Sequence, residues 1–141
     1  MKRQILFCFI IYGVFSCSDT DSDPRCNFLL DIKVVHEINL NLPQYNDLNF
    51  ISNSVYISNI GNGGVIVINS GTGFLAWDAA DPNIPFGECS ILSINGIEAQ
   101  NTCYENKYSL ITGQSIKTQL TCPLKTYRAE QNGGSLIITS F

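Results

Sequence analysis

The sequence is poor in basic residues and in histidine, and both shortages exclude classes of function. Its 141 residues include eight Lys and Arg against twelve Asp and Glu, for a net charge of −4. Nucleic acid and anionic lipid carry dense negative charge, so an acidic chain without a basic cluster is a poor partner for either. The single histidine, His36, gives no support to a Ser-His-Asp triad. Gly-x-Ser-x-Gly and EF-hand motifs are also missing, and we expect no enzymatic activity.

Cysteine pairs with the spacing of metal ligands are missing as well. None of the six Cys stands in a Cys-x-x-Cys pair, which argues against a zinc site or an all-cysteine cluster. Four carboxylates fall close together in the sequence or in neighbouring loops, namely Asp78, Asp81, Glu88 and Glu105. Such carboxylates can hold Ca²⁺ or transfer protons. A solvated acidic rim is the commoner explanation, and it is the one we expect.

No apolar run in the sequence is long enough to cross a bilayer. Residues 5–15 are mostly apolar but fall short of the roughly 20 residues that a spanning helix needs. Lys2 and Arg3 precede this run and a small residue ends it, which is the plan of a secretory signal. The junction Val14-Phe15-Ser16-Cys17 resembles the lipobox of bacterial lipoproteins. The resemblance implies a signal peptide over residues 1–16 and lipid attachment at Cys17.

An acidic segment without apolar residues follows this junction. Residues 18–24 contain three Asp and cannot join a core, so we expect a tether over residues 17–27. Loss of Lys2 and Arg3 with the signal would move the net charge from −4 to −6. The tract resembles that of surface-exported lipoproteins of the Bacteroidetes type, and a plain linker is the alternative. We expect a protein of the bacterial envelope, held in the outer membrane by its lipid, on a face that the sequence leaves open.

Alternating residue types predict strands in the rest of the chain. From residue 32 to residue 42, apolar side chains and His36 hold the even positions, which is the period of a half-buried strand. Short β-branched or aromatic runs follow at residues 55–57, 65–68, 74–77 and 136–139. Asn95-Gly96 and Asn132-Gly133 each predict a hairpin. We predict an all-β domain, built as a sandwich or a barrel, with His36 buried in its core rather than binding a metal.

Five segments match the pattern of a known family in their order and spacing. Residues 64–69 and 74–78 lead to a first loop, residues 108–114 follow a second loop, and residues 123–127 and 134–138 complete the set. Tyr-Ser-Leu-Ile-Thr-Gly-Gln and Pro-Leu-Lys-Thr-Tyr are similar to the Phe-Asp-x-x-Thr-Gly and Pro-Leu-x-x-Tyr segments of the Rieske iron–sulfur domain. The resemblance implies a Rieske-like domain of stacked antiparallel sheets over residues 28–141.

The same resemblance indicates where the cluster ligands of the family would fall. A Rieske [2Fe–2S] centre is held by two Cys and two His, supplied as Cys-x-His and Cys-x-x-His. The matching positions hold Asp81 and Asn83 in the first loop, and Asn101 and Tyr104 in the second. Amides and a phenol are poor ligands for a soft iron–sulfur centre, and the chain has one His where two are needed. We therefore expect no [2Fe–2S] cluster, no other metal and no cofactor.

Four cysteines remain in the mature domain, an even number in an oxidising compartment. High-potential Rieske proteins carry a disulfide between their two cluster loops. The resemblance implies that Cys89 and Cys103 form this bridge here. Cys26 and Cys122 are then candidates for a second bridge, a pairing that the sequence leaves open.

The function that we expect is that of a cluster-free Rieske-like lipoprotein with a binding or structural role. Its partner would be an envelope protein or ligand that the sequence does not name. Trp77, Phe86 and Tyr104 are expected to be buried near the loops, and their exposure would instead indicate a contact surface. The alternative is a Rieske [2Fe–2S] electron-transfer protein, against which the residues at the ligand positions argue.

Overall fold

The computed structural model describes residues 23–117 and 119–141. The predicted signal peptide, the predicted lipidation site Cys17 and most of the predicted tether lie outside the described residues. Within the described part of the chain, no helix is long and apolar enough to cross a membrane.

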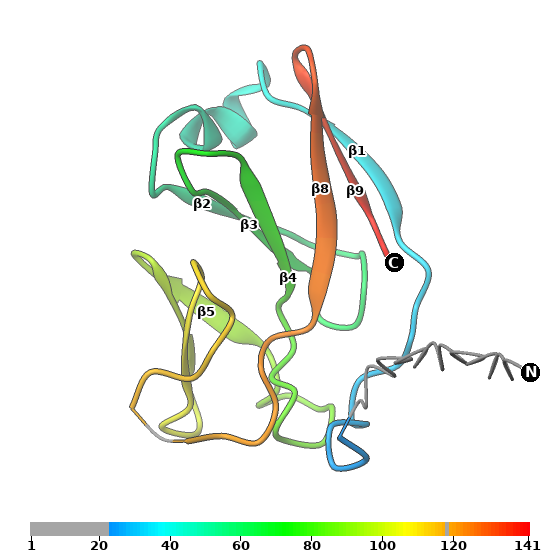
Figure 1. Cartoon of the computed structure of the whole chain (residues 1–141), viewed down its shortest axis with the longest axis vertical. Helices are drawn as coiled ribbons and strands as arrows, with labels where there is room; N and C mark the ends of the chain where they lie inside the picture. Colours follow the sequence, from blue (N-terminus) through cyan, green and yellow to red (C-terminus); the bar gives the residue numbers. More distant parts are fainter. Residues whose placement is uncertain (1–22, 118) are drawn as a thin grey trace, which may run out of the picture.

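The described chain is almost entirely β-structure, arranged in two antiparallel sheets (Figure 1). The larger sheet has six strands in the order β1-β9-β8-β4-β3-β2, and the smaller has three in the order β5-β6-β7. The all-β prediction with stacked antiparallel sheets is confirmed. The strands are β1 (Val35–Asn39), β2 (Ser54–Ile57), β3 (Val65–Asn69), β4 (Phe74–Asp78), β5 (Leu92–Asn95), β6 (Glu98–Asn101), β7 (Lys107–Ser109), β8 (Thr126–Asn132) and β9 (Ser135–Thr139).

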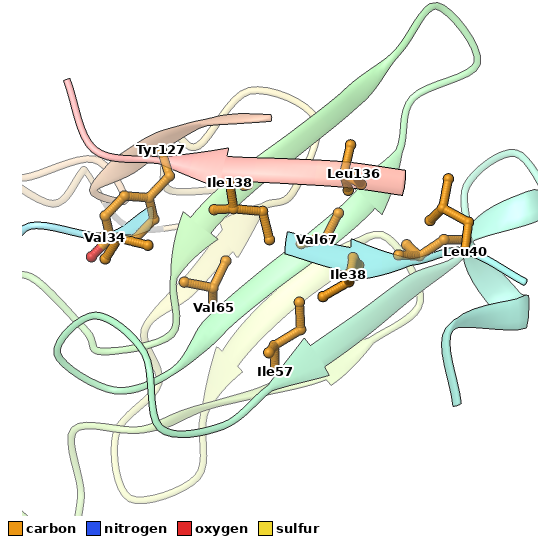
Figure 2. Close-up of a cluster of buried hydrophobic side chains, with 11 residues drawn as sticks. Val34, Ile38, Leu40, Ile57, Val65, Val67, Tyr127, Leu136 and Ile138 are labelled. Carbon is orange, nitrogen blue, oxygen red and sulfur yellow. The ribbon is translucent and has the colours of Figure 1, made fainter. Parts of the chain in front are cut away.

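The six-stranded sheet curls around one apolar core (Figure 2). Its two edge strands, β1 and β2, contribute Ile38 and Ile57 to that core, and β3 and β9 contribute Val65 and Ile138. All four side chains are at most 5% exposed. Curling lets one sheet bury its own concave face, so the larger sheet resembles half of a barrel.

Strand β3 is apolar on both faces because each face meets a different core. Val65 and Val67 point into the concave core, whereas Ile66 and Ile68 join a second cluster. This second cluster lies between the large sheet and the three-stranded sheet, and it includes Trp77 from β4. Continuous burial explains why β3 lacks the alternation of a half-buried strand.

Most predicted strands are confirmed, with shorter bounds in the first. Residues 32–40 keep their predicted alternation of faces, but the strand itself covers only Val35–Asn39 and Leu42 is exposed. The chain then turns into a 3-10 helix, η1 (Pro43–Asn49), because Pro43 can start a helix but cannot donate to a sheet. His36 is half-buried rather than fully buried. Both predicted hairpins form, as the β5–β6 and β8–β9 pairs.

Candidate functional site

Two loops approach each other beyond the ends of the strands. Residues 79–91 connect β4 to β5, and residues 102–106 connect β6 to β7. A bridge between Ala80 and Ile91 closes the base of the first loop. A third segment, residues 119–125, leads into β8 beside them. The first two loops carry three of the four positions that the sequence assigned to cluster ligands, and the fourth, Asn101, is the last residue of β6.

Asp81 lies at the centre of this site and is completely buried. Its Oδ1 accepts hydrogen bonds from the Asn83 backbone N–H at 3.0 Å and the Tyr108 hydroxyl at 2.5 Å. Its Oδ2 accepts from the side-chain amides of Asn101 at 3.1 Å and Asn106 at 2.8 Å. Four donors replace the water that a buried carboxylate loses, which is the condition for burying such a group.

Two amide side chains extend this network to neighbouring segments. Asn83 binds Cys122 at two points: its Nδ2 donates to the carbonyl at 2.7 Å and its Oδ1 accepts from the backbone N–H at 3.0 Å. The Asn83 Nδ2 also donates to the Tyr108 hydroxyl at 2.8 Å. Asn101 donates to the Cys89 carbonyl and accepts from the N–H groups of Cys103 and Tyr104. We call Asp81, Asn83, Asn101, Asn106 and Tyr108 the polar network.

The structure therefore brings together three of the four predicted positions. Asp81, Asn83 and Asn101 are joined by hydrogen bonds or through a shared partner. The fourth, Tyr104, contributes only its backbone N–H, while its side chain is 55% exposed. Asn106 and Tyr108 complete the network and were not singled out from the sequence. Their residue types are common on strands and in turns, so no signal in a single sequence separates them from other polar residues.

The expectation of a solvated acidic rim is wrong for two of its four residues. Glu88 and Glu105 are exposed, but Asp78 and Asp81 are completely buried. Asp78 accepts from the backbone N–H groups of Asn62, Gly63 and Ala80 and from the Tyr127 hydroxyl at 2.6 Å. The Asn62 side-chain amide adds a further bond. Each buried carboxylate has enough hydrogen-bond donors around it to replace water. The sequence does not show that these donors come together.

Both buried carboxylates are paired with a buried tyrosine. Burial raises the pKa of Tyr108 well above its usual range, and the hydrogen bond to Asp81 raises it further. Burial followed by the hydrogen bond to Asp78 raises the pKa of Tyr127 in the same way. Each phenol therefore stays protonated at neutral pH and donates a hydrogen bond, so neither tyrosine is suited to general-base catalysis.

Two disulfides hold the loops. Cys89 and Cys103 are bonded across the two loops, as the resemblance implied, with their Cα atoms 5.7 Å apart. Cys26 and Cys122 form the second bridge, with a Cα separation of 5.5 Å. All four cysteines of the described domain are thus oxidised. Among the described residues, no group of three or more His, Cys, Asp or Glu is arranged to hold a metal ion.

Comparison with known proteins identifies the fold. No family model and no curated protein matches the sequence. A chain in the complex of reduced oxygenase and oxidized ferredoxin in carbazole 1,9a-dioxygenase matches the structure with a TM-score of 0.53 and 14% identity, over 77% of this chain and 94% of that one. The fold is Rieske-like. The ferredoxin of carbazole 1,9a-dioxygenase from Nocardioides aromaticivorans IC177 matches with a TM-score of 0.49 and 11% identity, over 74% of this chain and 98% of that one.

Within the Rieske-like fold, the polar network sits where the two loops meet. The side chains of Asp81, Asn83 and Asn101 bind one another or the neighbouring backbone. This arrangement fixes the positions of the loops and accommodates a buried carboxyl group. The carboxyl group of Asp81 and the amides of Asn83 and Asn101 already have hydrogen-bond partners within the protein.

Proposed function

We propose that this protein is a lipid-anchored envelope protein whose Rieske-like domain holds no iron–sulfur cluster and serves a binding or structural role. The observation that supports the proposal most is the polar network. Asp81, the counterpart of the first cluster ligand, is buried and accepts four hydrogen bonds from protein donors. Hydrogen bonds among these residues hold the two loops in position, as metal coordination does in a metalloprotein.

The residues at these positions do not fit a [2Fe–2S] cluster. Such a cluster needs thiolates for one iron and imidazoles for the other. The two cysteines of the loops, Cys89 and Cys103, are bonded to each other and offer no thiolate. The only histidine, His36, lies on β1 in the large sheet. The amide nitrogens of Asn83 and Asn101 are already donating.

Iron content and visible absorption test the cluster-free state. We expect the natively purified protein to be colourless and free of iron. Reconstitution with iron and sulfide under anaerobic conditions should leave it so, which removes cluster loss during purification as an explanation. A red-brown protein with about two irons per chain would contradict the proposal and support the electron-transfer alternative.

Exposed aromatic side chains on the two loops support a binding role. Phe86 and Tyr104 are 57% and 55% exposed, whereas Trp77 is buried as expected. Both lie on loops that the Cys89–Cys103 disulfide joins, and large apolar side chains exposed on neighbouring loops can form a contact surface. We expect an envelope partner captured by the full-length chain to be lost from the double variant Phe86→Ser and Tyr104→Ser. The matched control is Val35→Ser, on an edge strand and 83% exposed, which should capture it unchanged.

The anchor rests on the resemblance of the Cys17 junction to a lipobox. We expect mass spectrometry of the membrane-extracted protein to find acyl chains on an N-terminal Cys17, since several chains together give stable anchoring. Cys17→Ser should leave the protein in the soluble envelope fraction. A Cys17→Ser protein that stays in the membrane fraction would refute lipid anchoring. Protease treatment of intact cells would then distinguish the surface from the periplasmic face.

A further inference from the structure

We propose that Cys89–Cys103 is a reversible thiol–disulfide exchange site, which is reduced and re-formed while the domain stays folded. The two bridges of the domain differ in access. Cys103 is exposed on its loop and Cys89 is half-buried. In the other bridge Cys26 is half-buried and Cys122 is 2% exposed, so that bridge has no exposed cysteine. Exchange requires an incoming thiolate to reach a disulfide sulfur, so access favours Cys89–Cys103.

The loops have a second connection that does not depend on the sulfur–sulfur bond. Asn101 Nδ2 donates to the Cys89 carbonyl at 2.8 Å, and Asn101 Oδ1 accepts from the Cys103 N–H at 2.9 Å. One buried side chain therefore holds the backbones of both cysteines. Reduction removes the covalent bond but leaves these two hydrogen bonds in place.

The base of the first loop is also fixed independently of the disulfide. The Asp81 N–H donates to the Ser90 carbonyl at 2.7 Å, and the Ser90 hydroxyl donates to the Gly87 carbonyl at 2.7 Å. Cys89 directly precedes Ser90 and lies within the short turn that the Ser90–Gly87 hydrogen bond closes. The Cα atoms of the two cysteines are 5.7 Å apart, which is within the range that a disulfide spans. We expect these contacts to keep the two cysteines near that separation after reduction, so that the bond can form again without refolding of the loops.

The exchange needs a dithiol as its co-reactant. A thiolate of the dithiol attacks the sulfur of Cys103, the exposed residue of the pair, the Cys89–Cys103 bond breaks, and Cys89 leaves as a thiolate that takes up a proton. The second thiol of the reductant then attacks the mixed disulfide and releases Cys103. Two electrons pass to the protein, which gains two thiols, and the reductant becomes a disulfide. Oxidation by a disulfide of the same class reverses both steps.

Charge around the bridge selects among such partners. Glu88 directly precedes Cys89 and Glu105 follows Cys103 by two residues, and both are exposed. Lys107, the first residue of β7, is the basic residue nearest to either cysteine in the sequence. Both carboxylates repel an anionic thiol and attract a cationic one. The co-reactant that fits is therefore a dithiol whose surface near the reactive thiol is neutral or basic.

Differential alkylation of the native full-length protein tests the proposal. The protein is titrated with dithiothreitol without denaturant, alkylated and mapped by mass spectrometry, with Cys26–Cys122 as the internal control. We expect Cys89 and Cys103 to be labelled at reductant concentrations about tenfold lower than Cys26 and Cys122. Near-UV circular dichroism should persist, and removal of the reductant should restore only the Cys89–Cys103 pair. Simultaneous labelling of both bridges, together with loss of the near-UV signal, would overturn the proposal.

A second experiment tests the charge selection. We expect cysteamine, a cationic thiol, to open the bridge faster than mercaptoethanesulfonate, an anionic one, by about fivefold at low salt after correction for thiolate content. The double variant Glu88→Gln and Glu105→Gln should bring the two rates close to each other. An unchanged rate ratio in this variant would refute the selection. These readouts are independent of iron content, so the exchange site and the proposed function can fail separately.

Discussion

At the scale of single residues, Asp81 and Asp78 show how carboxylates enter the interior of a small β-domain. Each is completely buried and each accepts a hydrogen bond from a buried tyrosine. The sequence placed Asp81 near Asn83 and Asn101 through the family resemblance. It gave no indication that Tyr108 completes the set, because that contact depends on how the three-stranded sheet packs. Pairing between a loop residue and a strand of another segment is not encoded in the periodicity of the strand.

Replacing Tyr108 with Phe should destabilise the domain. The variant loses the hydrogen bond to Asp81 Oδ1 and the one accepted from Asn83. A hydrogen bond to a charged group contributes about 2 kcal/mol to the free energy of unfolding, and urea denaturation measures the loss. Tyr104→Phe is the matched control: its side chain is 55% exposed and the change should be within about 0.5 kcal/mol. Equal effects of the two variants would show that the Tyr108 hydroxyl contributes nothing.

The same tyrosines predict a loss of stability in alkali. Their pKa values are raised in the folded protein, chiefly by burial, whereas unfolded tyrosine ionises near its ordinary value of about 10. Above that pH the unfolded chain releases protons that the folded chain retains, so the free energy of unfolding falls as pH rises. Each tyrosine contributes a slope of at most about 1.4 kcal/mol per pH unit. Denaturation midpoints measured between neutral pH and pH ~11 should fall, and less steeply in Tyr108→Phe.

At the scale of elements, the strands were predicted better than the turns that position them. Alternation placed the apolar face of β1 correctly, since that face meets the concave core. Strand β9 was predicted from a short β-branched run, which does not indicate a face. The 3-10 helix η1 was not predicted, because seven residues are too few to display a helical period. Residues 61–64 lie between β2 and β3 and hold Asp78 through the N–H groups of Asn62 and Gly63, a role that no sequence pattern indicates.

Two glycines with the same backbone conformation should differ in their response to substitution. Gly61 and Gly133 have φ of +66° and +59°, so alanine at either position is strained by about 1 kcal/mol. A Cβ at Gly61 would also lie 2.6 Å from the Tyr127 hydroxyl and 2.9 Å from Asp78 Oδ2, whereas at Gly133 nothing lies within 4 Å. We expect Gly61→Ala to lose about 2 kcal/mol more than Gly133→Ala in chemical denaturation. Equal losses in the free energy of unfolding would mean that Tyr127 and Asp78 can move away from the new Cβ at no cost.

At the scale of the whole molecule, the two sheets, their order along the chain and the contact between the two loops follow from the sequence pattern and the family resemblance. The polar network could not be predicted from the sequence. It depends on three separate segments, exemplified by Asp81, Tyr108 and the Cys122 backbone. Long-range polar contacts of this kind leave no periodic signal.

The two disulfides should contribute unequally to the stability of the whole domain. Cys26–Cys122 spans 96 residues and Cys89–Cys103 spans 14. In the chain-entropy model the longer loop contributes about 4.7 kcal/mol and the shorter about 3 kcal/mol. Denaturation of the paired variants, Cys26→Ala with Cys122→Ala and Cys89→Ala with Cys103→Ala, should rank them in that order. The reverse order would show that the bridges act on the folded state rather than on the unfolded chain.

The Cys26–Cys122 bridge also decides how the domain would bear mechanical load from a membrane anchor. A pull on the N-terminal side of the described chain reaches Cys26 before it reaches the edge strand β1. The covalent bond passes that force to Cys122, whose backbone is bound at two points by Asn83. Tension therefore enters the domain beside the polar network and bypasses the strand that would otherwise peel first. Reduction of this bridge alone would redirect the force to β1 and its hydrogen bonds with β9.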